Sequence, residues 1–200
     1  MKIKMGLEKY LSLLLVVTLL VLPLVFALSE TTYSGRAIGI LVDTNIIELK
    51  FADTGELPQQ GGMLDATLIK VEHELVKAAL LLSITMGFDN VAKSEATTFD
   101  VQLLPGNVNE ISADFVRAHS LANCDGIFGD SEIVNLRVAG QQINVSGEPN
   151  QMVSVPGFLT LIINEQINSS SGNTNEIKVN ALHLTLVSGE EVIVSSARSD

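Results

Sequence analysis

The sequence predicts an all-β protein: a single β-sandwich or jelly-roll-like domain that follows an N-terminal hydrophobic signal segment. Two observations lead to this prediction. From residue 34 onward the chain consists of short apolar or alternating runs separated by Gly, Asn and Pro, and no amphipathic helix exceeds three turns. The apolar residues are mostly Leu, Val, Ile and Ala, with seven Phe, two Tyr and no Trp, which favours a core of small and β-branched side chains.

The first element is a leader, residues 1–27. Three lysines precede an apolar stretch at residues 11–28, and Val25 and Ala27 fit the small-residue positions before a signal peptidase cut. The lysines are Lys2, Lys4 and Lys9. This pattern predicts a secretory signal peptide and a mature chain that begins at Leu28.

Two alternatives to cleavage before Leu28 remain open. The apolar stretch is long enough to cross a bilayer, so an uncleaved leader would act as an N-terminal anchor. Gly6 follows lysines and precedes an apolar helix, as at a prepilin peptidase site, although the charged residues after it are unusual there. A mature start at Leu28, Leu7 or Met1 would distinguish signal peptidase, the pilin route and the anchor.

The mature chain, residues 28–200, reads as a series of strands. The predicted strands are 35–42, 46–51, 67–73, 78–86, 97–104, 111–118, 133–138, 142–146, 152–155, 159–165, 177–187 and 191–196. Strands at this frequency are typical of one sandwich domain. Residues 63–82 also show some helical spacing, which leaves a helix as the competing interpretation there.

The strand at 111–118 has the clearest alternation. One face is predicted to carry Ile111, Ala113, Phe115 and Arg117, and the other Ser112, Asp114, Val116 and Ala118. Turn residues predict two hairpins, one around Ala139-Gly140 and one around Ser188-Gly189. Residues 106–110 and 168–176 are polar and are expected to be loops.

The charge is strongly acidic once the leader is set aside. The full chain has a net charge of −11, and residues 28–200 contain 9 basic and 22 acidic residues, a net charge of −13. Nucleic acid binding is disfavoured because it needs clustered Lys and Arg. Calcium or a basic partner would be favoured electrostatically, and a solvated surface explains the same charge.

Residues 123–132 form a Gly- and Asp-rich segment with candidate metal ligands. Asp125, Asp130 and Glu132 could supply oxygen ligands to calcium. The segment lacks the spacing of an EF-hand loop, so an ordinary turn between two strands is the competing interpretation. No other cofactor is expected.

The three histidines do not form a local metal signature. His73, His119 and His183 are too far apart in sequence for one, although strands could bring them together. His183 is predicted to share a face with Val179 and Ala181, which favours a packed or rim position. No serine lies in G-x-S-x-G and no acidic pair is evident, so the sequence predicts a protein that is not an enzyme.

Cys124 is the only cysteine. It is either buried and inert or paired with a cysteine outside this chain. Asn144 and Asn168 begin N-glycosylation sequons, and the second lies in a predicted loop, where an acceptor is expected.

Four stretches together resemble the choice-of-anchor P family. They are "SGRAIGI" at 34–40, "VNLRVAGQQINVSGEPN" at 134–150, "VSVPGFLTLIINEQ" at 153–166 and "VNALHLTLVSGEEVIVSSARSD" at 179–200. Their order and spacing cover essentially the whole mature chain, although residues 52–110 match only as a pattern of strands. The resemblance implies an exported, surface-anchored β domain for which no enzymatic activity is established.

One departure from the family concerns the C-terminal anchor, because no sorting motif, apolar tail or stop-transfer segment follows Asp200. Either the sequence is cut at the domain edge, the leader is the anchor, or the protein is released. The resemblance also implies a partner for Cys124, since family members often have a cysteine soon after the closing strand.

The expected function is that of a non-catalytic secreted or cell-surface β domain with an envelope-structural, adhesive or ligand-binding role. Its expected partners are the cell envelope or other surface proteins, with homo-oligomers as an option and no nucleic acid. A membrane would be contacted only through the leader or a missing C-terminal anchor. The alternatives are a subunit of an extracellular filament, assembled by strand complementation or pilin-type packing, and a surface hydrolase.

Overall fold

A computed structural model describes residues 31–171 and 174–200. Over these residues the chain is all-β, with thirteen strands, no helix and only antiparallel pairing. No helix in this part of the chain is long and apolar enough to span a bilayer. The predicted leader, residues 1–27, lies outside the described residues.

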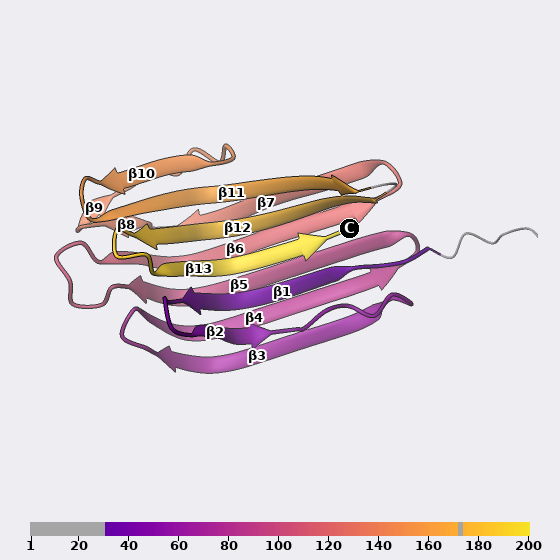
Figure 1. Cartoon of the computed structure of the whole chain (residues 1–200), viewed down its shortest axis with the longest axis horizontal. Coiled ribbons are helices and arrows are strands. Elements are labelled where there is room, and N and C mark those ends of the chain that lie inside the picture. The colour runs from indigo at the N-terminus through magenta and orange to yellow at the C-terminus, as the bar shows by residue number, and fades with distance from the viewer. Residues whose placement is uncertain (1–30, 172–173) are drawn as a thin grey trace, which may run out of the picture. The chain divides into compact units, whose positions relative to one another are not determined.

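The strands form two sheets (Figure 1). Sheet A contains, in spatial order, β10 (Gln151–Val155), β11 (Leu159–Ser171), β12 (Thr174–Leu186), β13 (Glu191–Ser199), β1 (Gly35–Asp43) and β2 (Glu48–Asp53). Sheet B contains β3 (Gly62–Glu72), β4 (Val76–Phe88), β5 (Val91–Leu103), β6 (Ile111–Asn123), β8 (Arg137–Val138) and β9 (Gln141–Gln142), and β7 (Gly126–Val134) also pairs with β6.

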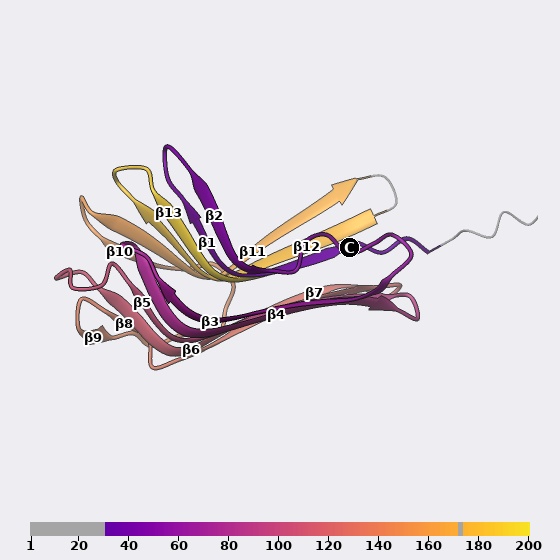
Figure 2. The ribbon, with the colours of Figure 1, turned by 90° about the horizontal axis from the view of Figure 1, so that it is seen from below.

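The chain order is that of a meander. Strands that follow each other in sequence are spatial neighbours in each sheet, and the main exception is β13, which returns to pair with β1. The predicted jelly-roll topology is therefore wrong, because a jelly roll needs Greek-key crossings between its sheets. The chain passes from sheet A to sheet B once, after β2, and returns once, before β10 (Figure 2).

The core lies between the two sheets. It is built from Leu, Ile, Val and Ala side chains of both sheets, as the composition predicts. The largest fully buried side chains include Ile40, Leu81, Leu103, Ile111, Leu136, Leu161, Ile163, Leu182 and Leu184.

A row of left-handed backbone conformations crosses each sheet. In sheet A the φ angles of Ala52, Ser195 and Asn164 are 51°, 55° and 53°, and the pairing register places Gly39 and Ala181 between them. In sheet B the φ angles of Lys70, Asp100 and Asn135 are 64°, 51° and 58°. Ala79 and Asp114 lie between these three in register.

These rows bend both sheets. On either side of each row, successive side chains alternate between the two faces of the sheet. At the row this alternation shifts by one residue, as it does at a β-bulge. In sheet A two successive residues then face the core, for example Ala181 and Leu182. Figure 2 shows that both sheets bend in the same direction near the middle of their strands, so the outer face of sheet A is concave.

The phase change corrects the predicted alternation of 111–118. Ile111 and Ala113 lie on one face as predicted, and that face is the core face, but Val116 and Ala118 face the core as well. Phe115 instead lies on the outer face of sheet B, where its ring packs edge to face against Phe99 with centroids 5.3 Å apart. The cause is the row at Asp100 and Asn135, which flanks Asp114 on the neighbouring strands.

Several predicted boundaries also change. Residues 63–82 form β3 and β4, so the helical alternative is wrong. Residues 123–132 are mostly strand, and only Cys124 and Asp125 form the turn between β6 and β7. Residues 168–171 and 174–176 are strand rather than loop, whereas most of 142–146 is not strand.

Both ends of residues 34–200 lie at the same end of the two sheets. Gly35 pairs with Ser199, and the backbone N–H of Asp200 donates to the carbonyl of Ser34 at 3.2 Å. The opposite end, called here the loop end, carries the connections at 44–47, 156–158 and 187–190, and the predicted hairpin around Ser188-Gly189 is confirmed there. The hairpin around Ala139-Gly140 is confirmed between β8 and β9.

Candidate functional site

The outward-facing side of sheet A, called here the concave face, is the strongest candidate for a functional surface. It carries two surface hollows and a polar network that cross neighbouring strands.

Three basic residues form a row across the concave face. Arg36 on β1 lies directly opposite Arg198 on β13, and Arg198 lies directly opposite Lys178 on β12. Side chains in such positions have Cβ atoms about 5 Å apart, where like charges repel. We call these three residues the cationic row.

Acidic side chains neutralise two members of the row. Arg36 donates from Nε and Nη2 to the two carboxylate oxygens of Asp53, at 2.8 and 2.5 Å. Glu56 reaches both guanidinium groups, accepting from Arg36 Nη1 at 3.2 Å and from Arg198 Nη2. The hydrogen bonds with Asp53 raise the pKa of Arg36, and those from Arg36 lower the pKa of Asp53, although partial burial opposes both shifts.

Lys178 differs from the two arginines. Across residues 31–171 and 174–200, no carboxylate oxygen lies within 4 Å of its Nζ atom. Glu176 lies near Arg198 instead, with its Oε2 3.6 Å from Arg198 Nε. The third cation of the row is therefore available to an external anion.

A hollow of about 200 Å³, called here the charged basin, lies beside the row. Its lining includes the row, Lys50 and the apolar side chains of Ile38 and Leu41. Four of the nine basic residues within residues 28–200 thus line one hollow in a strongly acidic protein. Glu48 and Glu56 also line it, so the basin is an ion-pair surface with an aliphatic floor.

A polar network around His183 lies next to the basin. His183 Nδ1 is 2.9 Å from Glu165 Oε2, and His183 Nε2 is 3.4 Å from Glu191 Oε2. Asn180 donates to the same Glu165 oxygen at 2.6 Å and accepts from Ser196 Oγ at 2.7 Å. The hydrogen bond between His183 and Glu165 raises the pKa of His183 and lowers that of Glu165, while burial opposes both shifts.

The prediction that His183 shares a face with Val179 and Ala181 is wrong. Val179 and Ala181 face the core, whereas His183 lies on the concave face with two carboxylates. The reason is the change of phase between Ala181 and Leu182, where the left-handed row crosses β12. An uninterrupted alternation would have placed His183 with Val179.

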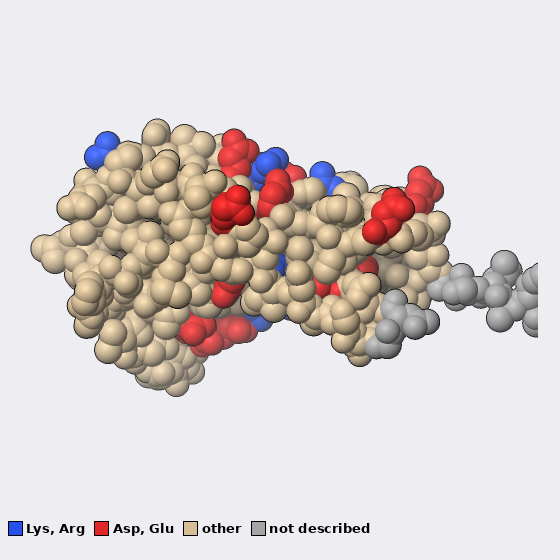
Figure 3. All heavy atoms as spheres, turned by 90° about the horizontal axis from the view of Figure 1, so that it is seen from above, with Lys and Arg blue, Asp and Glu red and all other residues tan. Residues whose placement is uncertain are grey.

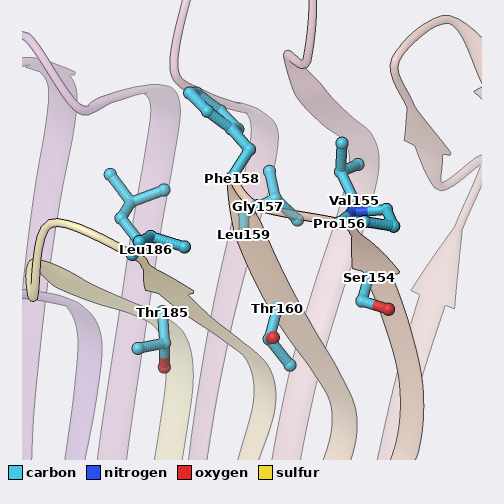
Figure 4. Close-up of a pocket in the computed structure, with 10 residues that line it drawn as sticks. Ser154, Val155, Pro156, Gly157, Phe158, Leu159, Thr160, Thr185 and Leu186 are labelled. Atoms are coloured by element: carbon cyan, nitrogen blue, oxygen red, sulfur yellow. The ribbon is translucent and has the colours of Figure 1, made fainter.

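An uncharged hollow of about 240 Å³ lies on the concave face at the loop end (Figure 4). Its floor includes a hydroxyl row in register on three neighbouring strands, Ser154, Thr160 and Thr185. Its apolar side includes Phe158 and Val187, and the backbone N–H of Val187 donates to the carbonyl of Phe158. We call this hollow the uncharged cleft.

Two exposed aliphatic side chains lie at the loop end, one of them in the lining of the uncharged cleft. Val187 is 74% exposed and Ile46, in the loop between β1 and β2, is 96% exposed. The two loops touch, because Asn45 donates from Nδ2 to the carbonyl of Ser188 at 3.3 Å. Figure 3, viewed from the β10 side, shows few charged side chains at the loop end and more toward the middle and the opposite end.

The predicted calcium ligands do not come together. Asp125 lies in the β6–β7 turn, whereas Asp130 pairs with His119 at 3.0 Å and Glu132 with Arg117 at 3.4 Å. Because a strand rises about 3.3 Å per residue, Asp125 and Asp130 are about 16 Å apart. Within residues 31–171 and 174–200, no three His, Cys, Asp or Glu side chains form a metal-binding group.

The three histidines lie in separate places. His73 is in the β3–β4 turn, where its Nδ1 accepts from the Leu75 backbone N–H at 3.2 Å. His119 is on the outer face of sheet B and His183 on that of sheet A. They share no site.

The remaining candidates are exposed. Cys124 has its side chain in solvent at the β6–β7 turn. Asn144 lies in an irregular exposed segment. Asn168 is exposed on β11 rather than in the predicted loop.

Comparisons of the chain with protein-family models, with curated proteins and with solved structures find no match. The resemblance to the choice-of-anchor P family therefore stays a prediction. The fold and the geometry of the concave face carry the functional argument.

Proposed function

We propose that this protein is an exported, non-catalytic β-sandwich domain, secreted or displayed at the cell surface, that binds an envelope or surface component through its concave face. The observation that carries the proposal is the clustering on that face. It combines the charged basin, the uncharged cleft and four of the nine basic residues of an acidic mature chain. Ligand sites are typically concave, with a few polar groups set among apolar ones.

The position of the chain ends supports surface display. Ser34 and Asp200 are neighbours at the end opposite the loop end. A tether before Ser34 or after Asp200 would leave from that end, so the uncharged cleft would point away from the attachment point. The leader-like residues 1–27 and the resemblance to the choice-of-anchor P family support export and tethering.

The partners of His183 support binding rather than catalysis. A nucleophile needs a base within hydrogen-bond reach. Both ring nitrogens of His183 face carboxylates, and the hydroxyl of Ser196 donates to Asn180 instead. We therefore assign the network a structural role beneath the binding surface.

A second candidate, the filament subunit, is favoured by the edge of sheet B. β3 is 11 residues long and pairs with β4 alone among the described strands, with Met63 and Ile69 exposed. Such an edge can accept a strand from another chain. The left-handed conformation of Lys70 interrupts it, so only its first eight residues form a regular template. Electron microscopy of the secreted protein would reveal regular fibres if this candidate were right.

Export can be tested with the full chain expressed in its host. Protease treatment of intact cells should degrade the protein, and the mature N-terminus should be Leu28. Protection from the protease, together with an N-terminus at Met1 in the cytosolic fraction, would exclude the proposal.

Binding can be tested with two charge-matched double variants of the processed protein. Lys50→Glu/Lys178→Glu changes the concave face, and Lys77→Glu/Lys93→Glu changes the outer face of sheet B by the same charge. We expect the first variant to bind isolated envelopes at least tenfold more weakly and the second to bind like the wild type. Equal losses would indicate a nonspecific charge effect.

A further inference from the structure

We propose that the cationic row binds an oxyanion group of the ligand, a carboxylate or sulfate, and that Glu56 occupies the site as an internal competitor in the free protein. This inference rests on the proposed binding function and names its ligand class.

The row is electrostatically unfavourable without anions. Arg36, Arg198 and Lys178 are in successive register on three neighbouring strands, and like charges in such positions destabilise a sheet. The mature chain has more than two acidic residues for each basic one, so three aligned cations do not follow from a generally basic surface. Their alignment indicates a site for a negative group.

Glu56 binds the arginines as an external oxyanion would. Each of its two carboxylate oxygens contacts a different guanidinium group, Arg36 Nη1 and Arg198 Nη2. Charge-assisted contacts of this kind are the usual way in which arginines hold carboxylates, sulfates and phosphates. Glu56 belongs to the connection after β2, and its side chain is 53% exposed.

Asp53 differs from Glu56 and is a permanent partner. It lies on β2, is 21% exposed and accepts two hydrogen bonds from Arg36. It therefore holds Arg36 in place while Arg36 Nη1 remains directed toward Glu56. A ligand that replaced Glu56 would find both arginines already positioned.

Replacement of Glu56 requires no movement of the backbone. The residues on either side of it are fixed, because the N–H groups of Thr54 and Leu57 donate to the carbonyls of Ala37 and Gly35 at 3.0 and 2.8 Å. The side chain of Leu57 is buried. Rotation of the exposed Glu56 side chain is enough to open the site.

The charged basin provides the remaining contacts. Lys178 Nζ supplies a third donor to the oxyanion, and Ile38 and Leu41 form an aliphatic surface for the body of the ligand. The hollow of about 200 Å³ is open to solvent beside these groups, so the oxyanion can be a substituent of a larger polymer. Aromatic side chains, which stack on sugar rings, are not among the lining residues.

The test uses the processed protein and sodium sulfate as the probe, with sodium chloride holding the ionic strength constant. Thermal unfolding is measured over a sulfate titration for the wild type and for Glu56→Gln, which removes the competing charge but keeps the shape. A bound anion stabilises the folded state by RT ln(1 + [L]/Kd), so the rise of the unfolding temperature with sulfate concentration reports the Kd. We expect Glu56→Gln to bind sulfate about tenfold more tightly than the wild type.

Two further variants locate the effect. Glu56→Gln/Lys178→Gln should lose most of the gain in sulfate affinity. Glu56→Gln/Lys77→Gln, which is altered on the other sheet, should keep that gain. Equal sulfate responses in all four proteins would overturn the proposal. If Glu56→Gln is too unstable to study, Lys178→Gln alone should bind sulfate more weakly than the wild type, and an unchanged affinity would overturn it equally.

The source of the oxyanion is resolved by a second probe, a trimer of galacturonic acid compared with a neutral galactose trimer. A larger shift of the unfolding temperature with the acidic trimer than with sulfate, at equal total charge of the added anion, indicates a polymer-borne carboxylate. An equal shift of the unfolding temperature indicates a discrete anion. A shift with the neutral trimer as well would overturn the oxyanion assignment. Sulfate binding is measured without envelopes, so it can succeed or fail independently of the envelope-binding test.

Discussion

Gly39 on β1 lies directly against Leu81 on β4, where the two sheets approach each other at the bend. A Cβ atom at Gly39 would be 2.7 Å from Leu81 Cδ2 and 2.9 Å from Leu81 Cβ, closer than such atoms can be. The carbonyl of Gly39 also accepts a hydrogen bond from Thr98 Oγ1 of sheet B at 3.2 Å. The missing side chain thus sets the separation of the sheets at this point.

Gly39→Ala should therefore destabilise the fold by about 1–3 kcal/mol, the usual cost of overpacking a core. Leu81→Ala alone should cost about 2–5 kcal/mol, because it leaves a cavity. The double variant should be more stable than the sum of the two losses predicts, since the new methyl group enters that cavity. Urea unfolding of the four proteins measures this coupling. Strictly additive losses of stability would show that Gly39 and Leu81 are not energetically coupled.

The left-handed row in sheet B gives a prediction for two exposed lysines. Lys70 has a φ of 64°, a conformation that glycine adopts without strain, whereas Lys77 on the neighbouring strand is not left-handed. Lys70→Gly should be neutral or stabilising by up to about 1 kcal/mol, and Lys77→Gly should destabilise by about 1 kcal/mol. The Lys70–Glu72 ion pair lost on substitution is exposed and contributes little.

Urea midpoints of these two variants provide the measurement. A loss of stability in Lys70→Gly as large as that in Lys77→Gly would mean that the backbone at Lys70 is not left-handed. The bend of sheet B would then need another explanation.

His183 makes the stability of the fold depend on pH. Its pKa is raised above 6.5, mainly by the hydrogen bond with Glu165, so its contribution is fully present below pH 6.5 and is lost as the pH rises through the raised value. The pKa of Glu165 is lowered below 4.5, so its contribution is present above that pH and is lost as the pH falls through the lowered value. The charged groups around the pair are Glu191 on β13 and Lys178 on β12.

The pair should therefore stabilise most between about pH 4.5 and 6.5. His183→Gln should lower the free energy of unfolding by about 1–2 kcal/mol at pH 5.5 and by less at pH 8.5. Urea unfolding of both proteins at the two pH values measures the difference. An equal loss of unfolding free energy at the two pH values would mean that His183 stabilises the fold by packing and not by its charge.

Cys124 should react with a thiol reagent in the folded protein. Its side chain is exposed at a two-residue turn, which Asn123 supports by accepting from the N–H groups of Asp125 and Gly126. Labelling without denaturant should be as fast as that of a small free thiol, and Cys124→Ser should leave the unfolding temperature unchanged. Labelling that required unfolding would contradict the exposed turn. A blocked thiol in protein taken from cells would support pairing with an outside cysteine.

Much of the fold could be predicted from local sequence. Alternating and β-branched runs located the strands, and Ala139-Gly140 and Ser188-Gly189 marked two hairpins correctly, because turn chemistry is local. The two bends could not be predicted. They depend on non-glycine residues such as Ala52 and Ser195 in a conformation that their side chains disfavour, and only the packing of both sheets imposes it.

The missed bends explain the errors at the site. An alternation continued across Ala181 predicts the wrong face for His183, and no local pattern reveals the cationic row because its members are far apart in sequence. Only the register of β1, β12 and β13 brings Arg36, Lys178 and Arg198 together. A single sequence does not specify that register.

The most direct test of the binding face is a lysine footprint of the processed protein with and without isolated envelopes. Acetylation of each lysine is measured by mass spectrometry. We predict that Lys50 and Lys178, on the concave face, are protected on binding, while Lys70, Lys77 and Lys93, on sheet B, react as before. Protection of the sheet B lysines with Lys50 and Lys178 left reactive would contradict the account.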